Sequence, residues 1–257
     1  MDKFCCEHVT RRYQGQNVID DISLTLKEGE LVSLLGASGV GKTTLMGVLS
    51  GVERPDEGSV FLDGAEITGQ AGAVSYMLQK DLLLPYKTII DNVSLPLLLR
   101  GKVKKEARAA AQPHFTQFGL EGYENLYPHQ LSGGMRQRAA LLRTWLAGNS
   151  VLLLDEPFSA LDAITKAEMH RWYLSILAKI RTTTLFITHD VDEAVFLSDR
   201  IYVLAGKPGR ITQEILVEIP RPRNAESALT EPFIQYKREV LRAISAQEQL
   251  TVGAGLK

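Results

Sequence analysis

Positions 36–44 of the sequence read Gly36-Ala37-Ser38-Gly39-Val40-Gly41-Lys42-Thr43-Thr44. The first eight fit the pattern G-x-x-x-x-G-K-[ST], and they follow a strand-like run, Glu30–Leu35, and open a helix-like run, Gly41–Leu49. In such a loop, successive backbone N–H groups point at phosphate oxygens, and the helix adds the positive end of its dipole. Lys42 should then reach the β- and γ-phosphates of a nucleotide, and the Thr43 hydroxyl should coordinate Mg²⁺. The loop alone indicates a nucleoside triphosphate and leaves GTPases, kinases and motor ATPases equally open.

Strand-like and helix-like stretches alternate around this loop, which is typical of an α/β fold with a largely parallel sheet. Helical periodicity dominates from about 88 to 147, most clearly in Val103–Phe118, and predicts a helical subdomain inserted into the core. A final helix is expected from about Glu231 to Gln247. The other stretches predict strands at Ile22–Leu26, Ala73–Leu78, Val151–Leu154, Thr183–Thr188, Arg200–Leu204 and Ile211–Glu218.

Length, composition and charge exclude several classes of protein. The 257 residues are 45% hydrophobic and 23% charged, close to the averages of globular domains. Lys and Arg total 29 against 30 acidic residues, so the balance does not suggest nucleic-acid binding through a basic field. The longest apolar run, Ile201–Ala205, is far shorter than the roughly 20 residues of a membrane-spanning helix.

The N-terminal residues predict a cytoplasmic location. Acidic residues stand where a signal peptide would have a basic segment and an apolar stretch. Cys5 and Cys6 are adjacent and are the only cysteines, which does not suit a disulfide framework. We expect them to pack on a first strand.

A second stretch adds two carboxylates. Val151-Leu-Leu-Leu-Asp-Glu-Pro157 is an apolar strand that delivers Asp155 and Glu156 at its C-terminal end, where ligands of open α/β sheets bind. Asp155 would hold the Mg²⁺ shell, and Glu156 would polarise the attacking water. A plain turn would explain Asp-Glu-Pro in isolation, but the loop at Lys42 favours the catalytic interpretation.

The most specific segment is Leu131-Ser-Gly-Gly-Met-Arg-Gln-Arg138. Ser132 suits a helix N-cap, and the absent side chains of Gly133 and Gly134 let a second helix N-terminus approach an anion. At this point the sequence resembles the ABC (ATP-binding cassette) ATPases, whose signature is LSGGQ-like, and the resemblance covers residues 3 to 220. It implies an α/β fold: a P-loop NTPase (RecA-like) core with an antiparallel β subdomain and an inserted α-helical subdomain. The ATPase domain would span 1–220 with its helical subdomain at about 88–147, and 221–257 would form a C-terminal helical tail.

The remaining family elements occur in order along the chain, and the resemblance assigns their roles. Tyr13 matches the aromatic that stacks on adenine, and Gln79 matches the glutamine that contacts Mg²⁺ and water and begins the loop toward the membrane partner. Ser159-Ala-Leu-Asp162 matches the D-loop along a dimer seam, and His189 matches the histidine that touches the γ-phosphate. The expected catalytic residues are Lys42, Glu156 and His189, and the expected Mg²⁺ ligands are Thr43, Gln79 and Asp155. The expected ATP-binding residues are Tyr13, Gly36, Ala37, Ser38, Gly39, Val40, Gly41, Lys42, Thr43, Thr44, Ser132, Gly133 and Gly134.

The chain departs from the family pattern in its helical region. Met135 replaces a frequent glutamine, and the residues after Arg138 keep Arg143 but introduce Thr144 and Trp145. We expect changed packing in the helical subdomain and no loss of catalysis.

A cassette of this family without membrane helices implies an importer subunit. The implied partners are a second cassette in a homodimer, integral membrane permease subunits and, indirectly, an extracytoplasmic solute-binding protein, with no nucleic acid. The location would be the cytoplasmic face of the cell membrane. Apolar residues of Leu82–Tyr86 and Leu95–Leu99 would line a groove for a short permease helix.

The solute class rests on similarity alone. Pro208–Ile211 and Ile219–Arg223 resemble the tail of nitrate, aliphatic sulfonate and taurine importers, whereas Leu142–Leu146 and Leu161–Lys166 lean toward importers of thiamine-precursor pyrimidines. The rival interpretations are a soluble ABC ATPase acting on nucleic acid or the ribosome, and a P-loop small-molecule kinase. The kinase would leave Leu131–Arg138 and His189 without a role.

Overall fold

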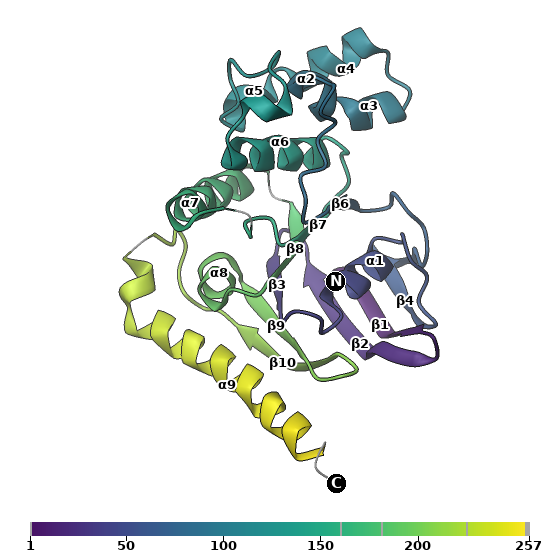
Figure 1. Ribbon diagram of the computed structural model, residues 1–257, viewed down its shortest axis with the longest axis vertical. Coiled ribbons are helices and arrows are strands. Elements are labelled where there is room, and N and C mark those ends of the chain that lie inside the picture. The colour runs from purple at the N-terminus through teal and green to yellow at the C-terminus, as the bar shows by residue number, and fades with distance from the viewer. Residues whose placement is uncertain (1, 160, 181, 225, 255–257) are drawn as a thin grey trace. The chain divides into compact units, whose positions relative to one another are not determined.

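The computed structural model describes residues 2–159, 161–180, 182–224 and 226–254. For 163, 177–180 and 246–254 only the backbone is described. The chain divides into two compact units: one comprises residues 1–74 and 182–257, and the other comprises residues 75–181. Each unit is described separately below (Figure 1).

An antiparallel sheet of four strands forms part of the first unit. Its order is β2-β1-β4-β5, with bounds β1 Asp2–Tyr13, β2 Gln16–Lys27, β4 Glu57–Leu62 and β5 Ala65–Glu66. Gln14 and Gly15 connect β1 to β2, and both have positive φ, as a tight hairpin turn requires. Cys6 is buried on β1 and its thiol donates to the Ile22 carbonyl at 3.6 Å, which confirms the expected packing of the cysteines.

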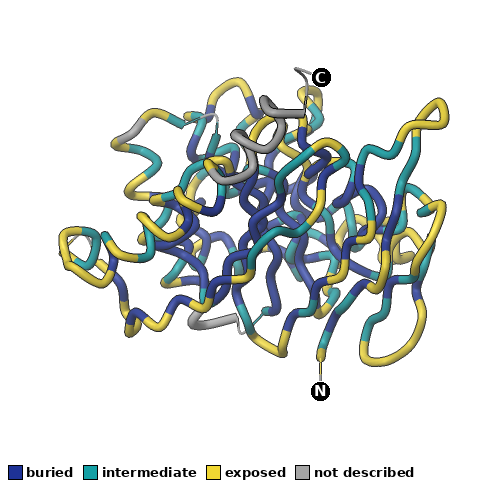
Figure 2. Tube along the Cα trace, turned by 90° about the horizontal axis from the view of Figure 1, so that it is seen from below, coloured by how far each residue is buried: buried dark blue, intermediate teal, exposed yellow. Residues whose placement is uncertain are grey.

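Parallel strands form the core of the first unit. The strands β8 Thr183–Thr188 and β9 Arg200–Ala205 flank β3 Leu31–Leu35 in parallel, and β10 Arg210–Leu216 pairs antiparallel with β9. Every residue of β3 and β8 is buried, as is common for strands of a parallel sheet, although Ser33, Thr183, Thr184 and Thr188 are polar. Figure 2 shows the buried residues of the trace in dark blue. Helix α1 Lys42–Leu49 follows β3 along the chain, and α8 Val191–Leu197 follows β8. The predicted α/β class is confirmed, and β10 lies one to two residues earlier than expected.

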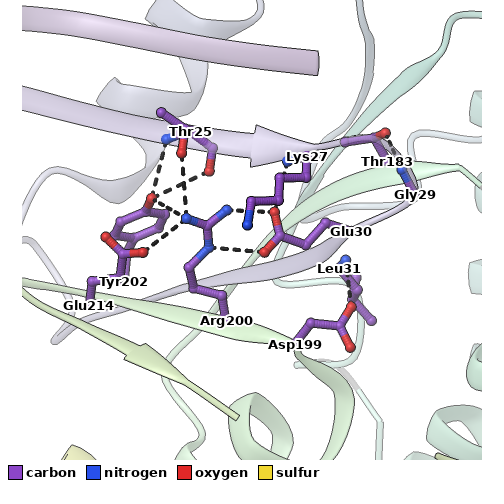
Figure 3. Close-up of polar contacts among 10 residues, drawn as sticks. All are labelled: Thr25, Lys27, Gly29, Glu30, Leu31, Thr183, Asp199, Arg200, Tyr202 and Glu214. Atoms are coloured by element: carbon purple, nitrogen blue, oxygen red, sulfur yellow. Dashed lines mark hydrogen bonds and ion pairs between the residues drawn. The ribbon is translucent and has the colours of Figure 1, made fainter. Parts of the chain in front are cut away.

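A buried arginine joins four strands or strand ends in this unit (Figure 3). Arg200 is 5% exposed and donates to both oxygens of Glu30, at 2.9 and 2.5 Å, to Glu214 at 2.9 Å, and to the Thr25 hydroxyl on β2 at 3.4 Å. Its guanidinium also lies over the ring of Tyr202, 5.5 Å from the centroid. Hydrogen bonds to ionised acceptors are the strong ones, so this cluster fixes β9 against β10 and the start of β3.

The C-terminal segment is part of the first unit. A short helix, η2 Ser227–Leu229, precedes α9 Glu231–Ala254, which packs on α8, β9 and β10 (Figure 1). Arg223 is 4% exposed and donates to five backbone carbonyls, three of them around the C-terminal end of α8. Burial, followed by the nearby charge of Arg221, lowers the pKa of Arg223 to about 10. The helix α9 begins where predicted and runs seven residues past the expected end.

The second unit combines two parallel strands with a group of helices. The strands β6 Ser75–Met77 and β7 Val151–Asp155 pair in parallel. The predicted helix over 103–118 is wrong as a single element: Pro113 has no N–H and separates two helices. The helices are α2 Ile89–Val93, α3 Leu95–Leu99, α4 Lys104–Ala111, α5 His114–Gln117, η1 Pro128–Gln130, α6 Gly133–Trp145 and α7 Ala163–Ile180.

The packing of α6 accommodates the departure from the family pattern. Trp145 lies against His114, with ring centroids 4.7 Å apart, and against Phe118 at 5.8 Å.

Within the residues that the structure describes, no helix is both long enough and apolar enough to cross a membrane.

Candidate nucleotide site

The loop after β3 is shaped by glycines. A Cβ at Gly36 would meet the Leu204 carbonyl oxygen at 2.4 Å, and a Cβ at Gly41 would meet the Ile19 side chain at 2.5 Å. Gly39 and Gly41 also have φ of +78° and +105°, a region that other residues avoid. The close turn therefore requires glycine at these positions, as the phosphate-loop interpretation expects.

Lys42 is 7% exposed and lies within its own loop. Its Nζ donates to the carbonyls of Gly36 at 2.8 Å and Ala37 at 3.0 Å. Ala37, Ser38, Gly39 and Thr43 are exposed around it, whereas Val40 is buried and Thr44 is half-buried. A buried ammonium beside an exposed run of backbone amides is an environment suited to phosphate.

Two other predicted residues belong to the same unit. Tyr13 ends β1 and is 41% exposed; a hydrogen bond to Glu53 and partial burial raise the pKa of its phenol. His189 follows β8 and is exposed. Asp190 caps α8 by accepting from the amides of Asp192 and Glu193, and the Thr188 hydroxyl bonds to the Glu193 carboxylate. The turn that carries His189 is thus fixed on both sides.

The carboxylate pair lies in the second unit, at the end of β7. Asp155 is 4% exposed, and the Tyr76 hydroxyl donates to it at 3.4 Å. Gln79 follows β6, and its Nε2 donates to the Glu156 carboxylate at 3.0 Å. Glu156 has φ +43°, and the amide and hydroxyl of Ser159 both donate to its carbonyl, at 3.2 and 3.1 Å. The structure therefore brings Gln79 to Glu156, the residue next to Asp155.

The start of α6 is the second helix end that the sequence singled out. Ser132 is exposed, and its Oγ accepts from the Met135 amide at 3.3 Å, which confirms it as the N-cap. A Cβ at Gly134 would meet the Thr165 methyl at 3.0 Å, so packing against α7 restricts that position. Among the described residues, a Cβ at Gly133 would meet nothing nearer than Leu161, at 3.6 Å. Packing within the described chain accordingly explains the glycine at 134 and leaves the one at 133 unexplained.

Two arginines of α6 bind the segment after Gln79, a feature that the sequence did not predict. Arg143 donates to the carbonyls of Asp81 and Leu82, at 2.5 and 2.8 Å, and burial lowers its pKa. Arg136 donates to the Asp81 carboxylate at 3.2 Å and to the Leu131 carbonyl at 2.8 Å. The two bonds of Arg136 thus connect Asp81 to Leu131, the residue before Ser132. The only sequence signal was Arg143, which the family pattern shares.

The apolar residues expected to face a partner range from buried to exposed. Leu83 is buried, whereas Leu82, Tyr86 and Leu99 are 52%, 72% and 81% exposed.

Within the D-loop match, Asp162 caps α7: its carboxylate accepts from the Thr165 amide and hydroxyl, at 3.0 and 2.6 Å, and these bonds lower its pKa. Ala160, in the same match, lies outside the described residues.

The architecture defined by these elements is that of a P-loop nucleoside triphosphatase. A family model described as "ABC transporter" matches residues 19–159, more than half of the chain. The chain belongs to the ABC transporter family, and it is an ATPase.

Relatives with import functions are similar over nearly the whole chain. The formylaminopyrimidine import ATP-binding protein ThiZ of Halalkalibacterium halodurans is 42% identical over 248 residues, 95% of this chain and 96% of that protein. An aliphatic sulfonates import ATP-binding protein SsuB of Bacillus cereus is 37% identical over 225 residues, 88% of this chain and 87% of that protein. The dimeric post-hydrolysis structure of the ATP-binding cassette MJ0796, bound to ADP and Pi, has a TM-score of 0.73 at 28% identity, over 84% of this chain and 100% of that chain.

Proposed function

We propose that this protein is the ATP-hydrolysing subunit of an importer whose membrane subunits are separate chains. The observation that carries the proposal is the placement of Glu156 at the end of β7, beside Asp155 and 3.0 Å from the Gln79 amide. This carboxylate is positioned to accept a proton from an attacking water, and the Gln79 amide orients it. The ATPase domain would span 1–220, with the helical subdomain at about 88–147, and the helical tail at 221–257 would pack on it.

Lys42 and the loop at 36–44 would bind the phosphates of ATP. The buried Lys42 ammonium can exchange its loop carbonyls for the β- and γ-phosphates, where charge develops during transfer. Mg²⁺ prefers oxygen ligands, and Thr43, Gln79 and Asp155 offer a hydroxyl, an amide oxygen and a carboxylate. When bound, the ion would neutralise charge on the phosphates. Tyr13 would stack on the base and His189 would contact the γ-phosphate.

The glycine at 133 supports a shared active site. No described residue requires glycine there, so the space beside the N-terminal amides of α6 suits the close approach of an anion from outside. We propose that two copies related by a two-fold axis each offer Ser132, Gly133 and Gly134 to the nucleotide held at Lys42 of the other. The dimeric form of the MJ0796 cassette supports this arrangement.

Three variants test the function and the shared site. Lys42→Ala should nearly abolish hydrolysis, and a rate near that of the wild type would refute the role of the loop. Glu156→Gln should bind ATP without hydrolysing it and accumulate as a dimer in size-exclusion chromatography. Mixing Lys42→Ala chains with Ser132→Arg chains should restore activity, because a mixed dimer has one site with both lesions and one with neither. An absence of restored activity in a mixture that forms dimers would contradict sharing.

The permease would dock on the exposed apolar residues of Leu82–Tyr86 and Leu95–Leu99, placing the protein at the cytoplasmic face of the membrane. The bonds of Arg136 and Arg143 link this segment to α6, which offers a route from the permease to Ser132. A solute-binding protein would act on the permease from the other side. Permease-dependent stimulation of hydrolysis that survives Tyr86→Asp would count against this surface.

The 42% identity to a formylaminopyrimidine import protein favours a thiamine-precursor pyrimidine as the solute. The 37% identity to a sulfonate import protein supports an alternative within the nitrate, sulfonate and taurine class. Hydrolysis by the complex reconstituted with its permease and binding protein should rise with one solute and not the other. Stimulation by neither would reject both solute classes and leave the ATPase assignment intact.

A further inference from the structure

The Tyr13 ring is held from two directions although it is 41% exposed. Its hydroxyl donates to the carboxylate of Glu53. The guanidinium of Arg11 lies over the ring, 4.8 Å from the centroid. We propose that Arg11 and Glu53 position Tyr13 as a preorganised stacking surface for the purine base, and so set the affinity for ATP. This inference rests on the proposed binding of the base at Tyr13.

Glu53 connects Tyr13 to the end of α1. The Glu53 amide donates to the Gly47 carbonyl at 2.9 Å. A Cβ at Gly47 would lie 3.1 Å from Oε1 of Glu53, so the glycine gives the carboxylate room beside the helix. The helix α1 starts at Lys42. The tyrosine hydroxyl is therefore tied to the same helix whose first residue is expected to bind the phosphates.

Arg11 is fixed by two carboxylates. Its Nε lies 3.4 Å from Glu53, and its NH1 lies 3.2 Å from Asp56. Asp56 also accepts the Arg12 amide at 2.6 Å, which holds the strand next to Tyr13. These contacts leave the guanidinium little freedom to move away from the ring.

This geometry determines how the ring can be used. One face is occupied by Arg11, so a base would stack on the opposite face. A cation on one face attracts the π-electrons of the ring, which favours an electron-rich partner on the other. Because the ring is already ordered, binding need not immobilise it, and less of the stacking energy is lost. A tyrosine with a purely packing role would have no need of an exposed, doubly restrained ring.

Steady-state kinetics of the full chain test the proposal. Arg11→Ala and Glu53→Ala should each raise the KM for ATP about two- to ten-fold, the range that corresponds to ordering one side chain, with kcat unchanged. Glu53→Gln keeps an oxygen that can accept from Tyr13 and should retain a KM close to that of the wild type. Arg12→Ala is the matched control, because the Arg12 side chain bonds to Asn17 and Glu57 and not to the ring.

Two further measurements separate positioning from other effects. In a Tyr13→Ala background, Arg11→Ala should have no further effect on KM, because the ring through which it acts is gone. The affinity for inorganic tripolyphosphate, which has no base, should be unchanged by Arg11→Ala and by Glu53→Ala. The proposal would be overturned if Arg11→Ala and Glu53→Ala left the KM for ATP unchanged, or if they weakened tripolyphosphate binding as much as ATP binding. It would also be overturned if Arg11→Ala raised the KM by the same factor in the Tyr13→Ala background as in the wild type. A failure of the proposed function would be seen separately, as hydrolysis that does not depend on Lys42.

Discussion

Glu156 has a backbone conformation that is strained for a residue other than glycine. Its φ of +43° lies in the left-handed region, and Pro157 follows it, which disfavours a right-handed helical conformation before the proline. Replacing Glu156 by glycine or by alanine removes the same carboxylate and the same bond from Gln79. The two variants differ only by a Cβ, so their comparison isolates the strain.

The size of the difference follows from two opposing terms. A non-glycine residue in the left-handed region costs about 1–2 kcal/mol. The greater freedom of glycine in the unfolded chain costs about 0.5–1 kcal/mol. Taking the middle of each range, Glu156→Gly should be more stable than Glu156→Ala by about 0.75 kcal/mol, or about 1.5–3 °C in Tm for a chain of this size. Both variants should be inactive in hydrolysis.

Urea unfolding followed by tryptophan fluorescence measures this difference. The chain has two tryptophans, Trp145 and Trp172, and both lie in the same unit as Glu156. The midpoint should move to higher urea in the glycine variant with the slope unchanged, since the surface exposed on unfolding is the same. A glycine variant no more stable than the alanine variant would refute the argument that residue 156 is strained.

Three further predictions follow from the second unit and the metal. Gly133→Ala should leave the urea midpoint unchanged but lower hydrolysis and ATP-induced dimerisation. Gly134→Ala should lower the urea midpoint, because its methyl group crowds Thr165. Equal effects of the two variants on stability would contradict an external ligand at Gly133. Arg108 donates to both oxygens of Asp91 at 2.8 Å and, as the largest cause, lowers the pKa of Asp91 from 3.8 to about 2. Stability from this pair is thus fully present above pH 4 and lost as the pH falls through 2. Because Arg108 is partly exposed, Asp91→Asn should cost about 1 kcal/mol at pH 7 and clearly less at pH 2, and equal costs at both would disprove the pairing. EDTA should stop hydrolysis and excess Mg²⁺ should restore it, so turnover that persists in EDTA would exclude a Mg²⁺-dependent reaction.

The sequence could predict those parts of the site that a single contiguous segment carries. The residues 36–43 form one loop and the start of α1, and Asp155 and Glu156 stand at and just after the end of one strand, so their pattern shows in the chain itself. Tyr13 and His189 have no such context and are found only through resemblance to the family. The structure places Tyr13 at the end of β1 and His189 just after β8, both exposed, which no periodicity could have indicated.

Contacts between distant residues could not be predicted. Arg200 and Glu30 are 170 positions apart, and Arg136 and Asp81 are 55 apart, so no local pattern pairs them. Periodicity also misjudged the region around Pro113, where apolar spacing continues across a residue that cannot donate the helical hydrogen bond. The tertiary fold decides which arginine finds which acceptor.

Arg223 ties the start of the C-terminal tail into the folded unit. The expected end of the ATPase domain is residue 220, yet the guanidinium three residues later supplies donors to five buried carbonyls of the unit. A fragment cut at residue 220 would leave those carbonyls without this partner, and unpaired buried carbonyls are costly. The smallest fragment able to fold independently would then have to extend past Arg223, and sequence changes in the tail would alter protein abundance in the cell even where they leave every nucleotide contact untouched.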